Sequence, residues 1–373
     1  MRILQVHHNS IFEVGGHELF IRTLCEKLIE RRWCVSVITP SHKSIVTMYT
    51  TAKGLLLINL PVYWIHNRVH IFKPHHLRKA IEAIKSAQIV HIHSPDDPFT
   101  FLIGILSKLL GKKVITTIFA YADDLKHHEK IKRFYGLITV MLQTLTAFFS
   151  DKVHVASTYD MTKMHLFKDK LVLIPLGISD RFFKEKIDRV KVNTCPLILY
   201  LGRINKAKGV DVLLRAIGIM VNKKIHVRLN IVGPDNDYLK TLQNLVKELK
   251  IGAYVEFLRE VTDVEKKISL IDHADIIVIP SLSDVVEAYS LVASEAWARG
   301  KWVIASNVGA LKYRVKDGVN GYLCKPGDPI ELADKILKSL ENNRVLRPPP
   351  DIWSLDRTAN AFEKLYIKVL NSQ

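Results

Sequence analysis

Strand-like and helix-like patterns alternate along this chain from one end to the other. Short apolar runs rich in β-branched residues, such as 197–201 and 275–280, are followed by longer amphipathic stretches. This alternation is typical of parallel sheets whose strands are joined by crossover helices. We therefore predict an α/β chain, with strands at 3–7, 35–40, 56–60, 89–93, 114–119, 153–157, 171–175, 197–201, 226–232, 255–257, 275–280 and 302–305.

The length of the chain predicts two domains. A chain of 373 residues is long for one hydrophobic core and suits two α/β domains of ordinary size. The segment 179–196 is charged, lacks a clean period and ends in proline, so we place the linker there. The predicted domains are 1–185 and 186–355, followed by an amphipathic helix over 356–373.

Composition indicates where the protein works. No apolar run reaches the roughly 18–20 residues that span a bilayer. The nearest candidate, 136–149, carries Gln143, and we interpret it as a core helix rather than a membrane-inserted one. The first residues already form a strand pattern instead of a leader, so we expect a cytoplasmic protein. Its 4 cysteines are scattered singly, which predicts neither a disulfide framework nor a zinc site.

The formal charge of +17 predicts attraction to anionic partners. Apolar residues stand beside cations in 71–79, and further cations lie in 112–113 and 126–130. This pattern suits docking on an anionic membrane surface, although an ordinary solvated basic face explains it equally well. No nucleic-acid motif occurs, and the aromatic residues are too few for a base-stacking platform, so we expect no nucleic acid as partner.

Two glutamates flank the start of the helix predicted after the run 275–280. In open α/β sheets, ligands collect at the carboxyl ends of strands, where helix N-termini offer N–H groups to anions. A diphosphate would fit at this place. Glu287 and Glu295 stand just over two helical turns apart, so both carboxylates can reach one pocket. The alternative is a solvated helix residue and an acid that favours the helix dipole.

A second segment carries two cations after a strand. The run 197–201 is followed by Gly202 and Arg203, and then by Lys208 and Gly209. An arginine offers a bidentate fork to phosphate oxygens and a lysine offers a compact point charge. Together they can hold a diphosphate and offset the negative charge that develops as it leaves. A solvated basic loop is the alternative.

The order of these landmarks resembles the retaining nucleotide-sugar glycosyltransferases of family 4, and the resemblance covers nearly the whole chain. The landmarks, in order, are Gly15-Gly16-His17-Glu18, His91-Ile92-His93, Ile174 to Gly177, Gly202-Arg203 with Lys208-Gly209, the glutamates Glu287 and Glu295, Gly309, and Asp317 to Asp328. The resemblance implies the GT-B fold, in which two Rossmann-like, doubly wound parallel-sheet domains face a cleft. It implies an acceptor-side first domain, a nucleotide-sugar-binding second domain, and a last helix that crosses back onto the first.

The resemblance also implies roles for the charged residues. Glu287 would contact hydroxyls of the transferred sugar, while Arg203 and Lys208 would stabilise the departing nucleoside diphosphate in place of a metal ion. Donor binding would involve Gly16, Val261, Tyr289, Ser290, Leu291 and Glu295. Among these, Glu295 would accept hydrogen bonds from the ribose. We expect no metal and no cofactor beyond the nucleoside-diphosphate sugar donor, and we name no protein nucleophile.

The chain departs from the family pattern at two places. The family commonly has Glu-Gly-Phe-Gly where this chain has Glu287-Ala288-Tyr289-Ser290. Losing both glycines is expected to remove access to positive φ and to favour a smaller or differently oriented sugar. Phe119 stands where many members carry a histidine near the reaction centre. Either Tyr121, Asp123 or another nearby histidine supplies that function, or the enzyme manages without it.

Other polar residues have simpler interpretations. We expect His91 and His93 to be packing residues rather than metal ligands, because no third ligand has suitable spacing. The acidic pairs 96–97 and 123–124 are interpreted as caps or loop residues, and 235–237 as a helix cap. The leading hypothesis is a metal-independent retaining glycosyltransferase acting on a hydroxyl of a glycan or lipid-linked acceptor. The alternative is a catalytically weak relative that binds a sugar nucleotide as sensor or scaffold.

Overall fold

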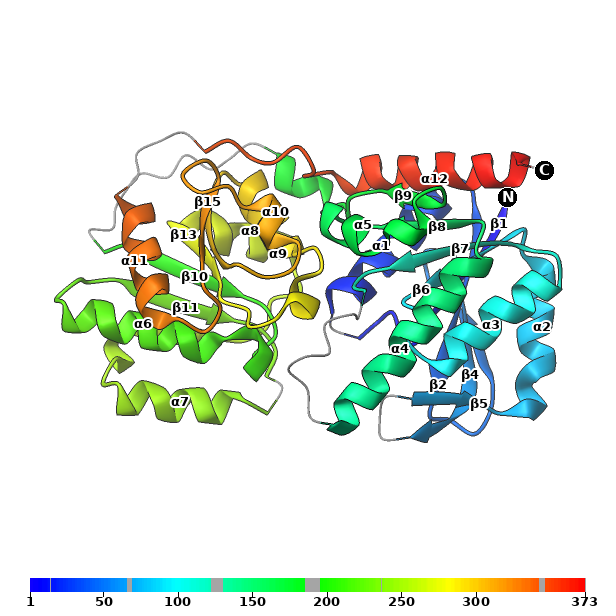
Figure 1. Ribbon diagram of the computed structural model, residues 1–373, viewed down its shortest axis with the longest axis horizontal. Helices are drawn as coiled ribbons and strands as arrows, with labels where there is room; N and C mark the ends of the chain where they lie inside the picture. Colours follow the sequence, from blue (N-terminus) through cyan, green and yellow to red (C-terminus); the bar gives the residue numbers. More distant parts are fainter. Residues whose placement is uncertain are drawn as a thin grey trace. The chain divides into compact units, whose positions relative to one another are not determined.

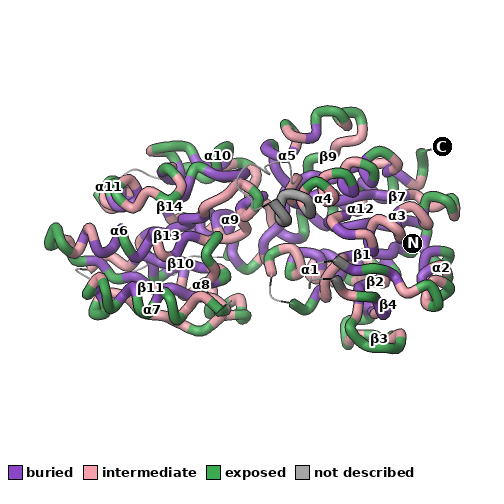
Figure 2. Tube along the Cα trace, turned by 60° about the horizontal axis from the view of Figure 1, so that its bottom comes forward, coloured by how far each residue is buried: buried purple, intermediate pink, exposed green. Residues whose placement is uncertain are grey.

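The computed structural model describes residues 1–13, 15–65, 69–121, 130–184, 195–235, 237–341 and 346–372. These residues form two compact units, Met1–Gly177 with Leu355–Gln373, and Ile178–Ser354. Figure 1 shows that each unit contains a sheet covered by helices. The central strands of both sheets are buried along most of their length, as Figure 2 shows, whereas strands at the margins are more exposed.

The sheet of the first unit is mostly parallel and has the order β3-β4-β2-β1-β6-β7-β8-β9. Its strands are β1 (Arg2–His7), β2 (Cys34–Ser41), β3 (Thr47–Thr50), β4 (Leu56–Ile65), β5 (Val69–Phe72), β6 (Ile89–His93), β7 (Lys113–Ile118), β8 (Lys152–Val155) and β9 (Leu171–Leu173). Strands β3 and β5 pair with β4 in antiparallel orientation and were not predicted. They form hairpins with β4 at the margin of an otherwise parallel sheet, which is common in α/β folds.

Helices cover both faces of the first sheet. They are α1 (Gly16–Glu30), α2 (Leu77–Ser86), α3 (Pro98–Leu109), α4 (Lys130–Phe149), α5 (Thr158–Lys163) and α12 (Leu355–Asn371), with 3₁₀ turns η1 (Pro74–His76) and η2 (His165–Phe167). On β1, Leu4 packs in the apolar core that includes Ile84 of α2 and Phe99 of α3. Gln5 points to the opposite face, toward Tyr366 of α12. Figure 1 shows α12 (red) lying along α1.

A buried polar network joins the first sheet to α12. The ring nitrogens of His91 lie 2.8 Å from the Tyr366 hydroxyl and 2.7 Å from the Thr117 hydroxyl. Nε2 of His93 lies 2.6 Å from the side-chain oxygen of Gln5. Burial lowers the pKa of both histidines well below 6.5, so both rings are neutral. His91 and His93 are therefore packing residues with hydrogen-bond partners.

Helix α4 is buried on one face only. Leu142 and Thr146 are buried, whereas Leu137 and Phe148 on another face are exposed. The sequence predicted a core helix over 136–149. The structure confirms this for the face that carries Leu142 and Thr146, but the face that carries Leu137 and Phe148 is exposed. Within the described residues, no helix is both long enough and apolar enough to cross a membrane.

The second unit has an entirely parallel sheet with the order β12-β11-β10-β13-β14-β15. Its strands are β10 (Leu197–Leu201), β11 (Arg228–Val232), β12 (Val255–Leu258), β13 (Ile276–Ile279), β14 (Trp302–Ser306) and β15 (Gly321–Cys324). Its helices are α6 (Val210–Asn222), α7 (Leu239–Glu248), α8 (Val264–His273), α9 (Leu291–Ala298), α10 (Leu311–Arg314) and α11 (Pro329–Leu340). One core contains residues of α6, α7 and α11, and the other contains residues of α8, α9 and α10. Strand β15 was not predicted.

Arg299 fixes the segment 182–184, which precedes the first strand of the second unit, by hydrogen bonds to its backbone. Its guanidinium pairs with both carboxylate oxygens of Asp272, at 2.7 and 2.6 Å, and donates to the Lys184 carbonyl at 2.8 Å. Phe182, in the 3₁₀ turn η3 (Asp180–Phe183), is buried in the core of this unit. The chain therefore enters the second unit at Ile178, earlier than position 186, and residues 185–194 of the expected linker lie outside the described residues.

Candidate functional site

The loops that follow β10 and β13 are held side by side. The two strands are parallel neighbours, so their carboxyl ends share one edge of the sheet. The N–H of Leu282 donates to the carbonyl of Ala207 at 2.9 Å. Gly209 has φ +66°, and a Cβ there would lie 2.0 Å from the Pro280 carbonyl oxygen. Only glycine allows this approach, and the approach brings Lys208 to Glu287.

Lys208 and Glu287 form an ion pair between these loops. Lys208 ends the 3₁₀ turn η4 (Lys206–Lys208), and Glu287 ends η6 (Asp284–Glu287). Nζ of Lys208 lies 2.6 Å from Oε1 of Glu287, and the Ser281 hydroxyl donates to the same oxygen at 2.7 Å. Glu287 is only 3% exposed, so its charge is balanced mainly by this lysine. Sequence analysis did not identify Ser281.

Gly309 fixes the backbone at Glu287. It has φ +50°, and a Cβ there would lie 2.3 Å from the Glu287 carbonyl oxygen and 2.6 Å from that of Asp284. The N–H of Gly309 donates to the Asp284 carboxylate at 2.7 Å, and the N–H of Ala310 donates to the Glu287 carbonyl at 2.9 Å. The orientation of η6 therefore depends on the loop after β14.

Arg203 is exposed in the same loop as Lys208. The loop is fixed by its backbone, since the Tyr200 hydroxyl donates to the Arg203 carbonyl at 2.8 Å and the N–H of Ile204 donates to the Pro234 carbonyl at 2.9 Å. Among the described residues, no side-chain partner of the Arg203 guanidinium is found. The guanidinium is therefore available to an anionic ligand.

Glu295 pairs with a different lysine. It lies in α9, is 5% exposed, and its carboxylate is 2.6 Å from Nζ of Lys267 in α8. The two carboxylates predicted to reach one pocket are thus each bound to a separate cation. Val261, predicted to lie near a nucleobase, is half-buried and packs against the same core as α8 and α9.

The turn before α9 keeps a left-handed residue without a glycine. Ser290, the N-cap of α9, has φ +63° and ψ +86°. The expectation that losing the glycine removes positive φ was wrong. A serine in this region costs on the order of 1–2 kcal/mol, so its surroundings must hold it there.

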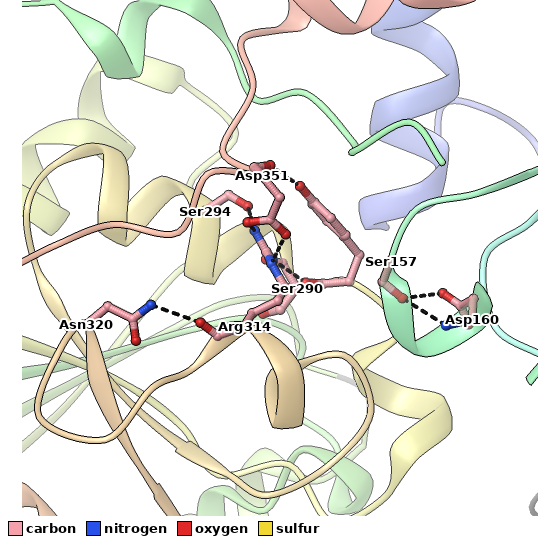
Figure 3. A network of polar contacts seen from close by, with 8 residues as sticks. Ser157, Asp160, Ser290, Ser294, Arg314, Asn320 and Asp351 are labelled. Atoms are coloured by element: carbon pink, nitrogen blue, oxygen red, sulfur yellow. Dashed lines mark hydrogen bonds and ion pairs between the residues drawn. The ribbon is translucent and has the colours of Figure 1, made fainter. Parts of the chain in front are cut away.

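The guanidinium of Arg314 supplies that support, as Figure 3 shows. It donates to the carbonyls of Tyr289 and, at 3.1 Å, Ser290, and to the Ser294 hydroxyl at 2.7 Å. Asp351 accepts from the same guanidinium at 2.7 and 3.3 Å. The first N–H groups of an α-helix have no partner within the helix, so those that begin with Leu291 can donate to an anion.

Tyr289 belongs to the same cluster. Its hydroxyl donates to the Asp351 carbonyl at 2.7 Å, and the Arg314 guanidinium lies 4.0 Å from the centre of its ring. Burial raises the pKa of Tyr289 to about 12, so it stays a hydrogen-bond donor at neutral pH. Sequence analysis missed Arg314 and Asp351, because no spacing rule links an arginine to an aspartate that follows a proline run.

In the first unit, the Gly-Gly-x-Glu segment begins α1. Gly15 is the N-cap, and Gly16 is the exposed first residue of the helix. The Glu18 carboxylate lies 3.5 Å from Nε2 of His7 and accepts from the Asn9 amide at 3.4 Å. Although burial raises its pKa, the hydrogen bond from His7 lowers the pKa of Glu18 to about 2. This carboxylate is therefore ionised at neutral pH.

A histidine lies directly beside Phe119. The ring of His17 stacks on Phe119 with centroids 4.1 Å apart and planes 9° apart. The Tyr121 hydroxyl is instead 2.9 Å from that of Thr144. Asp123, another candidate, lies outside the described residues. The sequence left three candidates for the function of the absent histidine: Tyr121, Asp123 or a nearby histidine. His17 is a histidine that lies next to Phe119.

Among the described residues of the first unit, five buried ring nitrogens have no hydrogen-bond partner. They belong to His8, Trp64, His70, His76 and His93. The other nitrogen of His70 bonds to the Asp97 carboxylate, which also caps α3 by accepting from the Thr100 N–H at 3.0 Å. Buried polar atoms are nearly always satisfied, so these nitrogens suit a ligand that carries hydroxyl groups.

Other acidic residues act as caps. Oδ1 of Asp235 accepts from the N–H groups of Tyr238 and Leu239, both at 3.0 Å, as its interpretation as a cap requires. Asn236 lies outside the described residues. In the part of the chain that the structure describes, no three His, Cys, Asp or Glu residues are grouped as metal ligands.

Comparison with known proteins gives matches along nearly the whole chain. The model described as Glycosyltransferase Family 4 matches residues 14–182, and the model described as Glycosyl transferases group 1 matches 182–350. A relative in sequence is the D-inositol 3-phosphate glycosyltransferase of Streptomyces avermitilis, 31% identical over 189 residues. That match spans 47% of this chain and 40% of the relative's length.

Solved structures share the fold over the full length. Sucrose-phosphate synthase from Thermosynechococcus elongatus has a TM-score of 0.79 at 21% identity and covers 100% of both chains. HepE of Anabaena in complex with UDP-glucose has a TM-score of 0.70 at 17% identity, over 99% of this chain and 97% of that chain. At these identities the likeness shows the fold. The chain therefore belongs to the glycosyltransferases with the GT-B fold, and its two parts match the family 4 model and the group 1 model in that order.

Proposed function

We propose that this chain transfers a sugar from a nucleoside-diphosphate sugar to a hydroxyl of a glycan or lipid-linked acceptor, with retention and without a metal ion. The observation that carries this proposal is the Lys208–Glu287 pair, with 2.6 Å between charged atoms, in the loop that also presents Arg203. The pair combines a phosphate-binding cation with a carboxylate suited to sugar hydroxyls. Family membership supports the reaction class.

In the proposed reaction, the bond between sugar C1 and the diphosphate oxygen breaks. A bond from the acceptor hydroxyl oxygen to C1 forms on the same face, and the hydroxyl proton passes to the departing diphosphate. Arg203 and Lys208 stabilise the charge that grows on the diphosphate, which is where fixed cations accelerate a reaction most. Glu287 accepts hydrogen bonds from the transferred sugar and orients it.

Donor binding uses the turn that Arg314 supports. The N–H groups of Tyr289, Ser290 and Leu291 would meet the phosphates at the start of α9, where the helix dipole favours an anion. Glu295 would accept from the ribose hydroxyls. Val261 would contact the nucleobase, and Gly16 would lie near the donor. UDP-glucose in the structure of HepE supports this donor class.

The acceptor would bind on the first unit. The unpartnered nitrogens of His8, Trp64 and His70 suit hydroxyl groups. The excess of 54 Lys and Arg over 37 Asp and Glu supports an anionic surface as a partner. In this proposal the protein works in the cytoplasm, peripheral on the cytoplasmic face of the membrane.

Thermal unfolding with UDP, GDP, ADP and their sugar conjugates tests the proposal. A ligand that binds only the folded state raises stability by RT ln(1 + [L]/Kd). We expect one nucleotide family to raise the Tm, and Arg203→Ala to remove most of that rise. The matching sugar conjugate should then be consumed with a hydroxyl acceptor. Absence of any shift at millimolar ligand contradicts the proposal, and binding without consumption favours a sensor or scaffold.

A further inference from the structure

Helix α4 presents an apolar stripe to solvent. Leu137, Met141, Leu145 and Phe148 are 54%, 52%, 45% and 74% exposed. Steps of four, four and three residues keep these side chains on one face of a helix. Single exposed apolar residues are ordinary, but a continuous stripe of four large ones marks an interaction surface.

The stripe is a fixed feature of the first unit, because the other face of α4 is packed. Leu142, Thr146 and Ala147 are at most 5% exposed, and Gln143 donates to the Asp96 carboxylate at 2.8 Å. Rotation of the helix about its axis would break these contacts. The apolar stripe therefore stays exposed while the fold is intact.

Cations surround the end of the stripe. Nζ of Lys170 lies 5.7 Å from the centre of the Phe148 ring. Burial, and next the nearby Lys108 ammonium, lower the pKa of Lys170, and Lys152 acts in the same direction. Two acids lie beside these lysines: Asp151 is 2.9 Å from Nζ of Lys108, and Asp169 precedes Lys170 and accepts at its carbonyl from Nζ of Lys152 at 3.0 Å. Lys108, Lys152 and Lys170 outnumber these two acids, so the C-terminal end of α4 carries a local excess of positive charge.

Another exposed apolar residue borders this cluster. Leu109, the last residue of α3, is 77% exposed and directly follows Lys108. Helices α3 and α4 are packed against each other. Large apolar side chains beside a local excess of lysines are the combination that binds the interface of an anionic lipid bilayer.

We propose that the α4 stripe, together with Leu109 and the lysines at its end, docks this protein on an anionic lipid surface. Leu145 and Phe148 insert among the acyl chains near the headgroups, while Lys152 and Lys170 bind lipid phosphates. A second copy of the chain is a poorer occupant, because pairing two such faces would bring like charges together. The proposal rests on the membrane location proposed above and names the surface that would make the contact; it does not require the transfer reaction.

The stripe on α4 runs from one edge of the first sheet toward the other. Helix α4 joins β7 to β8, and β7 is parallel to β6 and β8. It therefore starts from the carboxyl edge of the first sheet, near His8 and His93 at the ends of β1 and β6, and ends at the amino edge, where Phe148 and the lysines lie. An acceptor anchored in the same bilayer would share the surface on which the protein docks, which raises its effective concentration near the protein.

Vesicle flotation tests the proposal with the full chain and no nucleotide. The probes are phosphatidylcholine vesicles with and without phosphatidylglycerol. We expect the protein to float with the anionic vesicles, and Leu145→Gln/Phe148→Gln to lower the partition coefficient about tenfold or more. Glutamine is a good helix former, and both positions are exposed, so folding should be preserved. Ile330→Gln, at a 62% exposed position on α11, is the matched control and should bind like the parent.

Two further measurements identify the occupant. Lys152→Gln/Lys170→Gln should weaken binding to anionic vesicles and reduce its salt dependence. Sedimentation of the parent and the double glutamine variant tests for self-association. The proposal is overturned if the parent binds neither vesicle type, or if the stripe variant binds as the parent does. A parent that dimerises through the stripe, and a variant that does not, would also overturn it. Because no donor is present, failure here leaves the transfer reaction unaffected.

Discussion

The ammonium of Lys208 and the carboxylate of Glu287 lie 2.6 Å apart although 79 positions separate them in the chain. The contact arises because the loops after two neighbouring strands are fixed against each other. The Glu287 carboxylate also accepts from the Ser281 hydroxyl. A neutral amide at position 287 could therefore keep the hydrogen bonds from Ser281 and Lys208 while losing the negative charge. This property allows charge and shape to be separated by one substitution.

Glu287→Gln should lower the transfer rate strongly while sparing nucleotide binding. The amide keeps an acceptor for Ser281 and Lys208 but loses the charge that orients the sugar. We expect at least a ~10²-fold drop in kcat and a change of less than ~3-fold in nucleotide affinity. Initial rates and calorimetry measure the two effects. Glu256→Gln, at an exposed position on β12, is the control. Transfer at the parent rate would remove the catalytic role.

Arg203→Ala should weaken binding of the nucleoside diphosphate by about tenfold or more, because a charge-assisted bidentate contact is lost. Lys206 is exposed in the same loop and provides a matched control for the loss of one positive charge. Lys206→Ala should change the affinity by less than about threefold. Calorimetric titration with the diphosphate measures both, and equal effects of the two substitutions would contradict the specific role of Arg203.

Glu295→Gln should weaken binding of nucleotides but not of pyrophosphate. The proposed contact of Glu295 is with ribose hydroxyls, which pyrophosphate lacks. We expect about a tenfold loss for the nucleoside diphosphate, since hydrogen bonds to a charged group contribute about 1.5–3 kcal/mol. Lys267→Met serves as a comparison, because it removes the cation 2.6 Å from Glu295. A parallel loss for both ligands would show a general disturbance of the site.

Gly309→Ala should destabilise the second unit and reduce transfer. The new Cβ would lie 2.3 Å from the Glu287 carbonyl oxygen, so backbone has to move. We expect a loss of more than ~2 kcal/mol in the free energy of unfolding. Gly327→Ala is the control: its φ is +78° but nothing lies within 4 Å, so only about 1 kcal/mol of backbone strain is expected. Urea unfolding measures the free energy of unfolding of both variants. Equal losses for Gly309→Ala and Gly327→Ala would contradict the predicted clash.

Stability should fall as the pH falls below 6.5. Burial holds the pKa of His91 and His93 well below that value and lowers the pKa of His154 to about 4. Folded, these rings stay neutral between pH 6.5 and 4, while the unfolded chain takes up their protons. Their stabilisation is fully present above 6.5 and is lost toward acid, at up to ~1.4 kcal/mol per pH unit for each histidine.

Urea unfolding at a series of pH values measures this slope. Asp96 works in the opposite direction, because burial raises its pKa to about 6. It is one group against four, because burial also lowers the pKa of His8 to about 3. A free energy of unfolding that stays constant from pH 6.5 down to 4 would contradict the prediction.

The sequence predicted the parts of the molecule that follow from local pattern. The apolar runs correctly predicted most of the parallel strands. The loops after 197–201 and 275–280 were correctly predicted to carry residues that meet at the sheet edge, namely Lys208 and Glu287. The short strands β3 and β5 lie at the margin of the sheet, where burial imposes a weaker pattern. Strand β15 begins with a glycine and lies inside a run that was interpreted only as a family landmark.

Features that depend on long-range partners could not be predicted. The left-handed Ser290 depends on Arg314, which is 24 positions away, so the loss of a glycine was misjudged. The exposed face of α4 was also missed, because an apolar helix has the same composition whether one or both faces are packed. In both cases the local sequence was interpreted correctly, and the surroundings decided the outcome.

The Arg314–Asp351 pair decides where the second unit can be cut for separate expression. A fragment cut at the matched range 182–350 would end one residue before Asp351. It would also lack both Ile178 and Trp353, which are joined by a hydrogen bond of 3.0 Å from the Ile178 N–H to the Trp353 carbonyl. Leaving a buried arginine without its carboxylate costs about 3–5 kcal/mol. A soluble fragment should therefore run from Ile178 to Ser354, so the tail after the proline run belongs to the folding unit and does not act as a spacer.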